Sequence, residues 1–165
     1  MACWCPSLAL GQVMTRLGLD WTATPVRNSH QRTWSPFKVM ALFTAVYYVI
    51  YVFVNAIVNP YIMISPDGNP PNPPTWVSAL MVVRSLIGFA FGIFVLVMMI
   101  RTRAYIRQKS AIREQYCSGC DDCCLSFWCG CCTVAQMDRH TTDFRQCQAA
   151  CCSETGLSQQ TPFIV

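Results

Sequence analysis

Apolar residues form two long runs in the middle of the chain. The first covers residues 37–58, FKVMALFTAVYYVIYVFVNAIV, and its only charge is Lys38 at the start. The second covers residues 77–100, and its only charge is Arg84, about a third of the way in. A helix of about 22 residues is about 33 Å long, which is enough for a hydrocarbon core of about 30 Å. Both runs are long and apolar on all faces, so the pattern predicts two transmembrane helices rather than a buried helical hairpin of a soluble protein.

Arg84 is the one charge well inside a span, and we expect its side chain to extend toward the Trp76 end of the second run. Small residues four positions apart let helices approach closely in lipid. Such pairs occur at Gly88 and Gly92 in the second run and at Ala41 and Ala45 in the first. They predict close packing within the hairpin or in a homo-oligomer.

The segment between the runs, residues 59–76, is rich in proline and is predicted to be a loop. It carries one charge, Asp67, and no basic residue, whereas both outer flanks are basic. The flanking charges are Arg16, Arg27, Arg32 and Lys38 before the first run and Arg101, Arg103, Arg107, Lys109 and Arg113 after the second. The positive-inside rule therefore predicts that both termini are cytosolic, and we expect the plasma membrane. The first run starts too late for a signal peptide.

The predicted fold is mainly α, with a helical hairpin of two spans, flanking Cys-rich cytosolic segments and a short C-terminal helix. One Cys-rich membrane domain covers residues 1–165. Its parts are 1–36 (N-terminal Cys box and basic flank), 37–58 (first span), 59–76 (loop), 77–100 (second span), 101–116 (basic stretch), 117–152 (Cys-rich box) and 153–165 (tail). In the short helix, Val134, Met137 and Phe144 favour one side.

Composition agrees with a membrane protein, because 53% of the residues are hydrophobic and 12% are charged. The net charge of +4 is spread over the flanks of the apolar runs and forms no basic stripe. We therefore expect the lipid bilayer as a partner and no nucleic acid.

Cysteines are concentrated in two places, Cys3 and Cys5 at the start and ten residues between Cys117 and Cys152. On the cytosolic side stable disulfides are rare, so we expect free thiols. Thiolates bind soft or borderline ions such as zinc, cadmium and cuprous copper. The candidate metal ligands are Cys117, Cys120, Cys123, Cys124, Cys129, Cys131 and Cys132, with Zn²⁺ as the candidate ion.

Two other interpretations of these cysteines stay open. Cysteines beside apolar and aromatic residues near a span, as in CCLSFWCGCC, are palmitoylation candidates. A catalytic thiol would need one cysteine beside a base, and His140 is the only histidine near the cluster. No cysteine has the context of a nucleophile, so we expect that the protein is not an enzyme.

Two stretches, CWCPSLALGQV near the start of the chain and DDCCLSFWCGCCTVAQMDRH after the second run, combine cysteines with a glutamine. They resemble the two boxes of the placenta-specific gene eight family, which includes plant cadmium-resistance proteins and cell number regulators. The residues that match the first box are Cys3, Cys5, Pro6, Gly11 and Gln12, and those that match the second are Cys123 or Cys124, Cys129, Cys132, Gln136 and Arg139. Trp4 interrupts the cysteine–proline–cysteine triplet, and Gly130 stands where the family often has proline.

The resemblance implies a membrane-associated, often oligomeric protein linked to divalent metal homeostasis, cadmium resistance or control of cell number. It leaves open whether such a protein transports metal or regulates other proteins. Because the chain begins almost inside the first box, one expectation is that a segment preceding Met1 is missing from the sequence.

Overall fold

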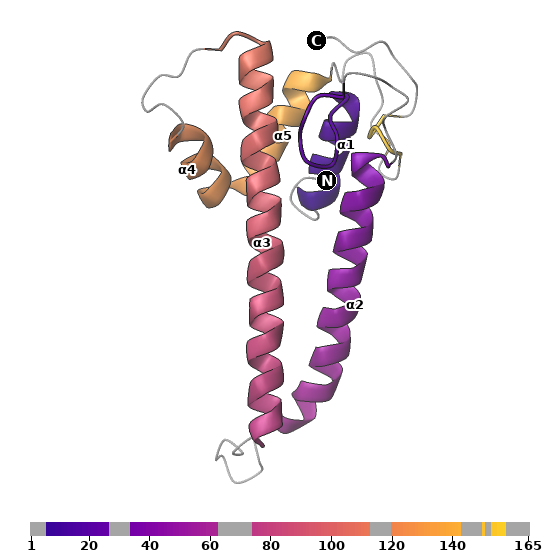
Figure 1. Ribbon diagram of the computed structural model, residues 1–165, viewed down its shortest axis with the longest axis vertical. Helices are drawn as coiled ribbons and strands as arrows, with labels where there is room; N and C mark the ends of the chain where they lie inside the picture. The colour runs from indigo at the N-terminus through magenta and orange to yellow at the C-terminus, as the bar shows by residue number, and fades with distance from the viewer. Residues whose placement is uncertain are drawn as a thin grey trace. The chain divides into compact units, whose positions relative to one another are not determined.

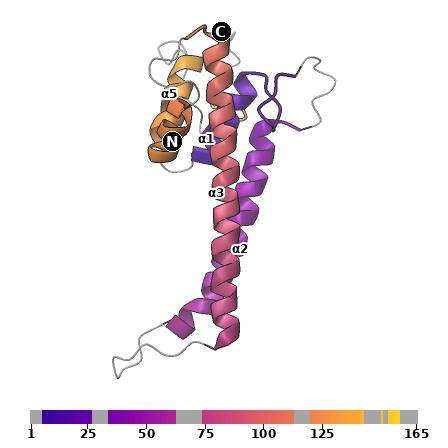
Figure 2. The same ribbon diagram turned by 60° about the vertical axis from the view of Figure 1, so that its left-hand side comes forward.

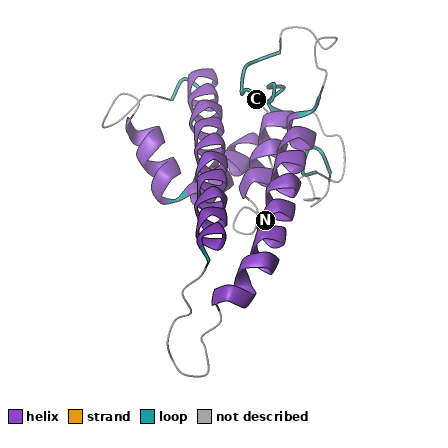
Figure 3. Ribbon diagram, turned by 60° about the horizontal axis from the view of Figure 1, so that its bottom comes forward, coloured by secondary structure: helices purple, strands orange, loops and turns teal. Residues whose placement is uncertain are grey.

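The computed structural model describes residues 6–26, 34–62, 74–112, 120–142, 150 and 153–157. Five helices form in this part of the chain, and it contains no β-strand (Figures 1 and 3). The helices are α1 (Pro6–Arg16), α2 (Pro36–Ile62), α3 (Thr75–Lys109), α4 (Cys120–Trp128) and α5 (Gly130–Thr141). The predicted mainly α fold class is confirmed.

The chain divides into two compact units. One unit is Phe43–Phe94, which holds most of α2 and the first part of α3. The other combines Met1–Leu42 with Val95–Val165, and it contains α1, α4 and α5 together with the first residues of α2 and the last part of α3.

Aromatic side chains join α2 to α3 within the unit Phe43–Phe94. The ring of Tyr47 is stacked on that of Phe91, with 4.7 Å between the ring centroids. The ring centroids of Phe43 and Phe94 are 5.4 Å apart. Such aromatic pairs add about 0.5–1.5 kcal/mol beyond the burial of their area. Contacts between large rings therefore hold the two helices of the hairpin together.

Arg84 has partners on the facing helix. Its guanidinium donates a hydrogen bond to the side-chain oxygen of Asn55 and lies 5.5 Å from the ring centroid of Tyr51. A charged side chain is costly within a membrane unless polar or aromatic groups surround it. Arg84 is therefore paired with groups of α2, and its expected extension toward Trp76 stays a prediction.

The small residues of the two helices differ in their surroundings. A Cβ atom added at Gly88 would lie 3.4 Å from the Tyr47 hydroxyl oxygen, so Gly88 faces α2. A Cβ atom added at Gly92 would meet nothing within 4 Å, and Ala45 is exposed. Ala41 is half-buried. Gly88 thus takes part in the hairpin, and the predicted homo-oligomer stays a prediction.

Both α2 and α3 are long and apolar enough to cross a membrane. Their apolar side chains are largely exposed, including Val49, Phe53 and Phe89. The helix α2 continues through Asn59 and Pro60, so the first residues of the predicted loop are helical. Proline at the end of a helix removes only one backbone hydrogen bond of the last turn, which the helix tolerates. Residues 63–73 of the predicted loop lie outside the described residues.

The first Cys box leads into a helix that the sequence analysis did not predict. Proline suits the first position of a helix, where its missing N–H group is not needed, and α1 begins at Pro6. It ends at Arg16, and Gly18 two residues later has a left-handed backbone with φ of 67°. The N–H groups of Gly18 and Leu19 donate to the carbonyl groups of Thr15 and Met14, at 3.2 and 3.0 Å. These two bonds are those of a Schellman motif.

In the unit that combines Met1–Leu42 with Val95–Val165, the core lies where α1 packs against α5 (Figure 2). Leu10, Val13 and Met14 of α1 are fully buried, as is Val134 of α5. At Gly11 an added Cβ atom would lie only 3.1 Å from the backbone of Phe37 at the start of α2. The glycine of the first box therefore allows α1 to lie close to α2.

Candidate metal centre

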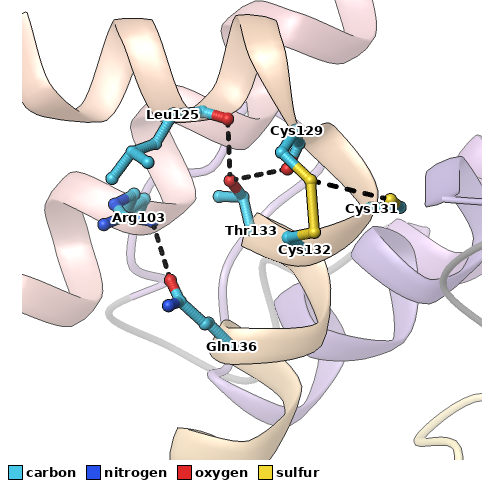
Figure 4. The surroundings of a disulfide bond; sticks show 7 residues. All are labelled: Arg103, Leu125, Cys129, Cys131, Cys132, Thr133 and Gln136. Atoms are coloured by element: carbon cyan, nitrogen blue, oxygen red, sulfur yellow. Dashed lines mark hydrogen bonds between the residues drawn. A yellow bond between two sulfur atoms is a disulfide. The ribbon is translucent and has the colours of Figure 1, made fainter.

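Cys129 forms the corner between α4 and α5 (Figure 4). Its N–H group donates to the Leu125 carbonyl group, and its carbonyl group accepts from the Thr133 N–H group, both at 3.0 Å. The Thr133 hydroxyl group donates to the carbonyl oxygens of Leu125 and Cys129, both at 3.1 Å. Thr133 is itself buried. These bonds fix the backbone of Cys129 relative to the first turn of α5.

Three cysteine sulfurs gather at this corner. The Sγ atoms of Cys129, Cys131 and Cys132 all lie within 4.8 Å of one another. Those of Cys129 and Cys131 are 4.0 Å apart, and Cys129 is joined to Cys132 by a disulfide (Figure 4). Cys129 and Cys131 are half-buried, whereas Cys132 is exposed.

The disulfide differs from the free thiols that the sequence analysis expected at these two positions. The C-x-x-C spacing at the start of a helix places the Cα atoms of Cys129 and Cys132 5.3 Å apart. This separation lies within the range of about 4.4–6.8 Å that disulfides require. The corner therefore lets these two sulfurs bond to each other as well as approach a shared ion.

The three sulfurs fit a thiophilic metal ion when the disulfide is reduced. Zinc–sulfur bonds of about 2.3 Å in a tetrahedral site place the sulfurs about 3.8 Å apart. The 4.0 Å between the sulfurs of Cys129 and Cys131 is close to this value. The corner can thus supply three ligands, one fewer than a closed structural zinc site needs.

Only some of the seven predicted ligands come together. Cys123 and Cys124 are exposed on α4. Among the described residues, neither belongs to the group of three neighbouring sulfurs. Cys120 begins α4, but its side chain is not among those described. Cys117 lies outside the described residues, as do Cys3 and Cys5 of the first box. The prediction for those residues stays open.

The two glutamines of the boxes connect separate segments. Gln12 is buried, and its side-chain amide donates to the Ser153 carbonyl oxygen at 3.0 Å. The side-chain oxygen of Gln136 accepts a hydrogen bond from the Arg103 guanidinium at 3.3 Å. Arg139 and His140 are exposed. The glutamines thus contribute contacts between segments, and neither belongs to the sulfur group.

An ion pair between Arg16 and Asp138 is the main feature that sequence reasoning missed. The Arg16 side chain is 3% exposed and that of Asp138 is 33% exposed. The Arg16 guanidinium also donates to the hydroxyl groups of Thr141 and Thr142. In the sequence Arg16 is one of the basic residues that flank the apolar runs, and no local pattern pairs it with a residue more than a hundred positions away. This pair joins the helix of the first box to that of the second.

A comparison with known families matches residues 1–140 to the PLAC8 family. This is the placenta-specific gene eight family that the two boxes resemble, so the resemblance is confirmed. The match includes the stretches CWCPSLALGQV and DDCCLSFWCGCCTVAQMDRH, both apolar helices and the sulfur group at the α4–α5 corner. No curated protein sequence and no solved structure matches the chain significantly.

Proposed function

Since the chain belongs to the PLAC8 family, we propose that it is a membrane protein whose Cys-rich box binds divalent metal ions of the zinc and cadmium type. In this proposal, binding of the ions supports their efflux from the cell or the tolerance of the cell to them. The single observation that carries the metal part is the group of Cys129, Cys131 and Cys132, whose sulfurs lie within 4.8 Å of one another.

Exposed apolar side chains support the membrane part of the proposal. Soluble monomers rarely expose continuous apolar patches larger than a few hundred Å². Phe53 on α2 and Phe89 on α3 are 66% and 69% exposed, and neighbouring apolar residues are exposed as well. A lipid environment accounts for such surfaces on helices of this length. The basic flanks favour cytosolic termini, and we propose the plasma membrane as the location.

The first experiment measures metal content per chain. The protein is purified in mild detergent under reducing conditions, and its zinc and cadmium are quantified by elemental mass spectrometry. We expect about one ion per chain, lost when Cys129, Cys131 and Cys132 are all replaced by serine. The matched control replaces Cys123 and Cys124, which lie outside the sulfur group, and should keep the ion. Absence of metal in every protein, even after zinc is added, would remove the metal part of the proposal.

A growth assay separates binding from a role in tolerance. Metal-sensitive cells that express the wild-type protein should grow at higher cadmium concentrations than cells that express the triple serine variant at equal membrane abundance. Equal growth, with metal binding lost in the variant, would mean that the bound ion has no part in tolerance.

The exposed face of α4 favours a second candidate function, an acylated scaffold that regulates growth or cell number without transporting metal. Phe127 and Trp128 are 69% and 83% exposed, and Cys123 and Cys124 on the same helix are exposed too. Aromatic residues of this kind favour the lipid–water interface, where nearby cysteines are acylated. Acyl exchange on these two cysteines tests the candidate, and absence of thioester-linked lipid would reject it.

A further inference from the structure

The three sulfurs of the candidate metal centre have two mutually exclusive chemical states. With Cys129 and Cys132 as thiolates, the corner offers three sulfur ligands to one ion. With these two residues in the disulfide, only the sulfur of Cys131 remains a thiolate ligand. Because a disulfide sulfur carries no negative charge, the oxidised corner loses two of its three ligands.

The backbone of the corner suits both states without a change of fold. The hydrogen bonds of Thr133 to Leu125 and Cys129 involve carbonyl groups and leave the sulfurs free to change partner. The separation of 5.3 Å between the Cα atoms of Cys129 and Cys132 is suitable for a disulfide. Oxidation therefore needs only movement of side chains.

The exposure of the two cysteine residues sets the order of the steps. Cys132 is exposed, so its thiolate can attack a low-molecular-weight disulfide such as oxidised glutathione. That step forms a mixed disulfide on Cys132 and releases one small thiol. The half-buried Cys129 then attacks the Cys132 sulfur and releases the second small thiol. In sum, two cysteine thiols are oxidised to one disulfide, and one small disulfide is reduced to two thiols.

We propose that Cys129 and Cys132 form a reversible redox pair whose oxidation by a low-molecular-weight disulfide releases the metal ion from the corner. The redox part stands on the sulfur geometry alone, and the release of metal rests on the proposed metal-binding function. In a reducing cytosol the pair is a dithiol and the corner binds metal. An oxidising pulse closes the disulfide and lowers the affinity for metal.

Disulfide mapping in the full-length protein tests the redox part. The protein is reduced in detergent, equilibrated with mixtures of reduced and oxidised glutathione, and alkylated. Cleavage after Trp128 and Arg139 gives a peptide, residues 129–139, in which Cys129, Cys131 and Cys132 are the only cysteines. We expect the Cys129–Cys132 disulfide to form at lower fractions of oxidised glutathione than any disulfide of Cys123. The proposal is overturned if Cys129 and Cys132 stay thiols while Cys123 oxidises, or if Cys132 stops at the glutathione adduct.

Two serine variants separate the redox pair from the metal ligands. Cys131→Ser removes a ligand but neither redox partner, so the disulfide should form at the wild-type glutathione ratio while metal affinity falls at least tenfold. Cys132→Ser should lose both the disulfide and the metal. Failure of Cys131→Ser to form the disulfide would contradict the assigned pairing.

Metal release is followed in the zinc-loaded wild-type protein with a chromogenic chelator during oxidation. We expect one zinc released for each Cys129–Cys132 disulfide formed. Disulfide formation in a protein that never binds zinc would reject the proposed metal function and keep the redox pair. Zinc that stays bound after the disulfide has formed would reject the inference and keep the metal function.

Discussion

Replacing Asp138 alone by leucine should destabilise the packing of α1 on α5 more than replacing Asp138 and Arg16 together. Among the described residues, Asp138→Leu leaves the hydroxyl groups of Thr141 and Thr142 as the hydrogen-bond partners of the buried Arg16 guanidinium. Removing one partner of a fully buried ion pair costs about 3–5 kcal/mol. Asp138 is 33% exposed, so water can partly solvate the remaining charge. We therefore expect a cost of about 2–3 kcal/mol.

The other two variants of the cycle should be less damaging. Arg16→Met leaves an aspartate whose side chain is a third exposed and can be hydrated, so we expect a cost of about 1 kcal/mol. Arg16→Met combined with Asp138→Leu removes both charges and replaces them with apolar groups, an exchange that is often neutral or stabilising. The two sites should therefore show a coupling energy of about 3–4 kcal/mol.

Hydrogen exchange of backbone amides, read by mass spectrometry in detergent, measures this cost locally. Each 1.36 kcal/mol lost from the free energy of opening speeds exchange about tenfold. Asp138→Leu should then speed exchange in α1 and α5 by about 30- to 150-fold. Amides of residues 43–62 and 77–94, which belong to the other compact unit, serve as the internal control and should not change.

Two results would refute the reasoning. If exchange in α5 of the Asp138→Leu protein matches that of the wild type, the ion pair does not stabilise the contact. If the factors of the two single variants simply multiply in the double variant, the charges do not interact energetically.

Two further predictions concern the glycines and the hairpin. Gly11→Ala should lower the free energy of unfolding by about 1–3 kcal/mol, because the new Cβ atom would lie 3.1 Å from the backbone of Phe37. Gly92→Ala should not destabilise the protein, because a Cβ atom there meets nothing within 4 Å. Thermal unfolding in detergent compares the two variants. Asn55→Leu should lower the stability of the hairpin by about 0.5–1.5 kcal/mol, since it removes the hydrogen-bond acceptor of Arg84, whereas Asn55→Asp keeps an acceptor and should not. Unfolding titrations with a denaturing detergent measure both variants. A leucine variant as stable as the wild type would contradict the role of this bond.

The helices that depend on apolar patterning could be predicted from the sequence. Unbroken apolar runs set the places of α2 and α3, and the spacing of Val134 and Met137 indicated the face of α5 that is buried. Phe144, the third residue of that predicted face, lies outside the described residues. In each case the burial or the length of one segment decides the structure. Neighbouring residues in the sequence carry that information, so it is visible before the fold is known.

Contacts between distant segments could not be predicted in this way. Arg16 has the same charge as the basic residues that flank the apolar runs, and only the packing of α1 on α5 reveals that it is buried with Asp138. Similarly, the sequence offered seven cysteines as ligands. The choice of Cys129, Cys131 and Cys132 depends on the sharp corner between α4 and α5, which their spacing alone does not specify.

The attachment of α5 makes the cysteine variants informative about chemistry rather than folding. Val134 and Met137 are buried and Asp138 binds Arg16, and all three of these residues lie after the last cysteine of the corner. The sulfurs themselves are exposed or half-buried, and their replacement by serine removes little buried apolar area. Exchange of the amides of residues 134–141 should therefore match that of the reduced wild-type protein when all three cysteines of the corner are replaced. If it does, loss of metal in that variant reports the loss of ligands; faster exchange would instead mean that the corner stabilises the helix.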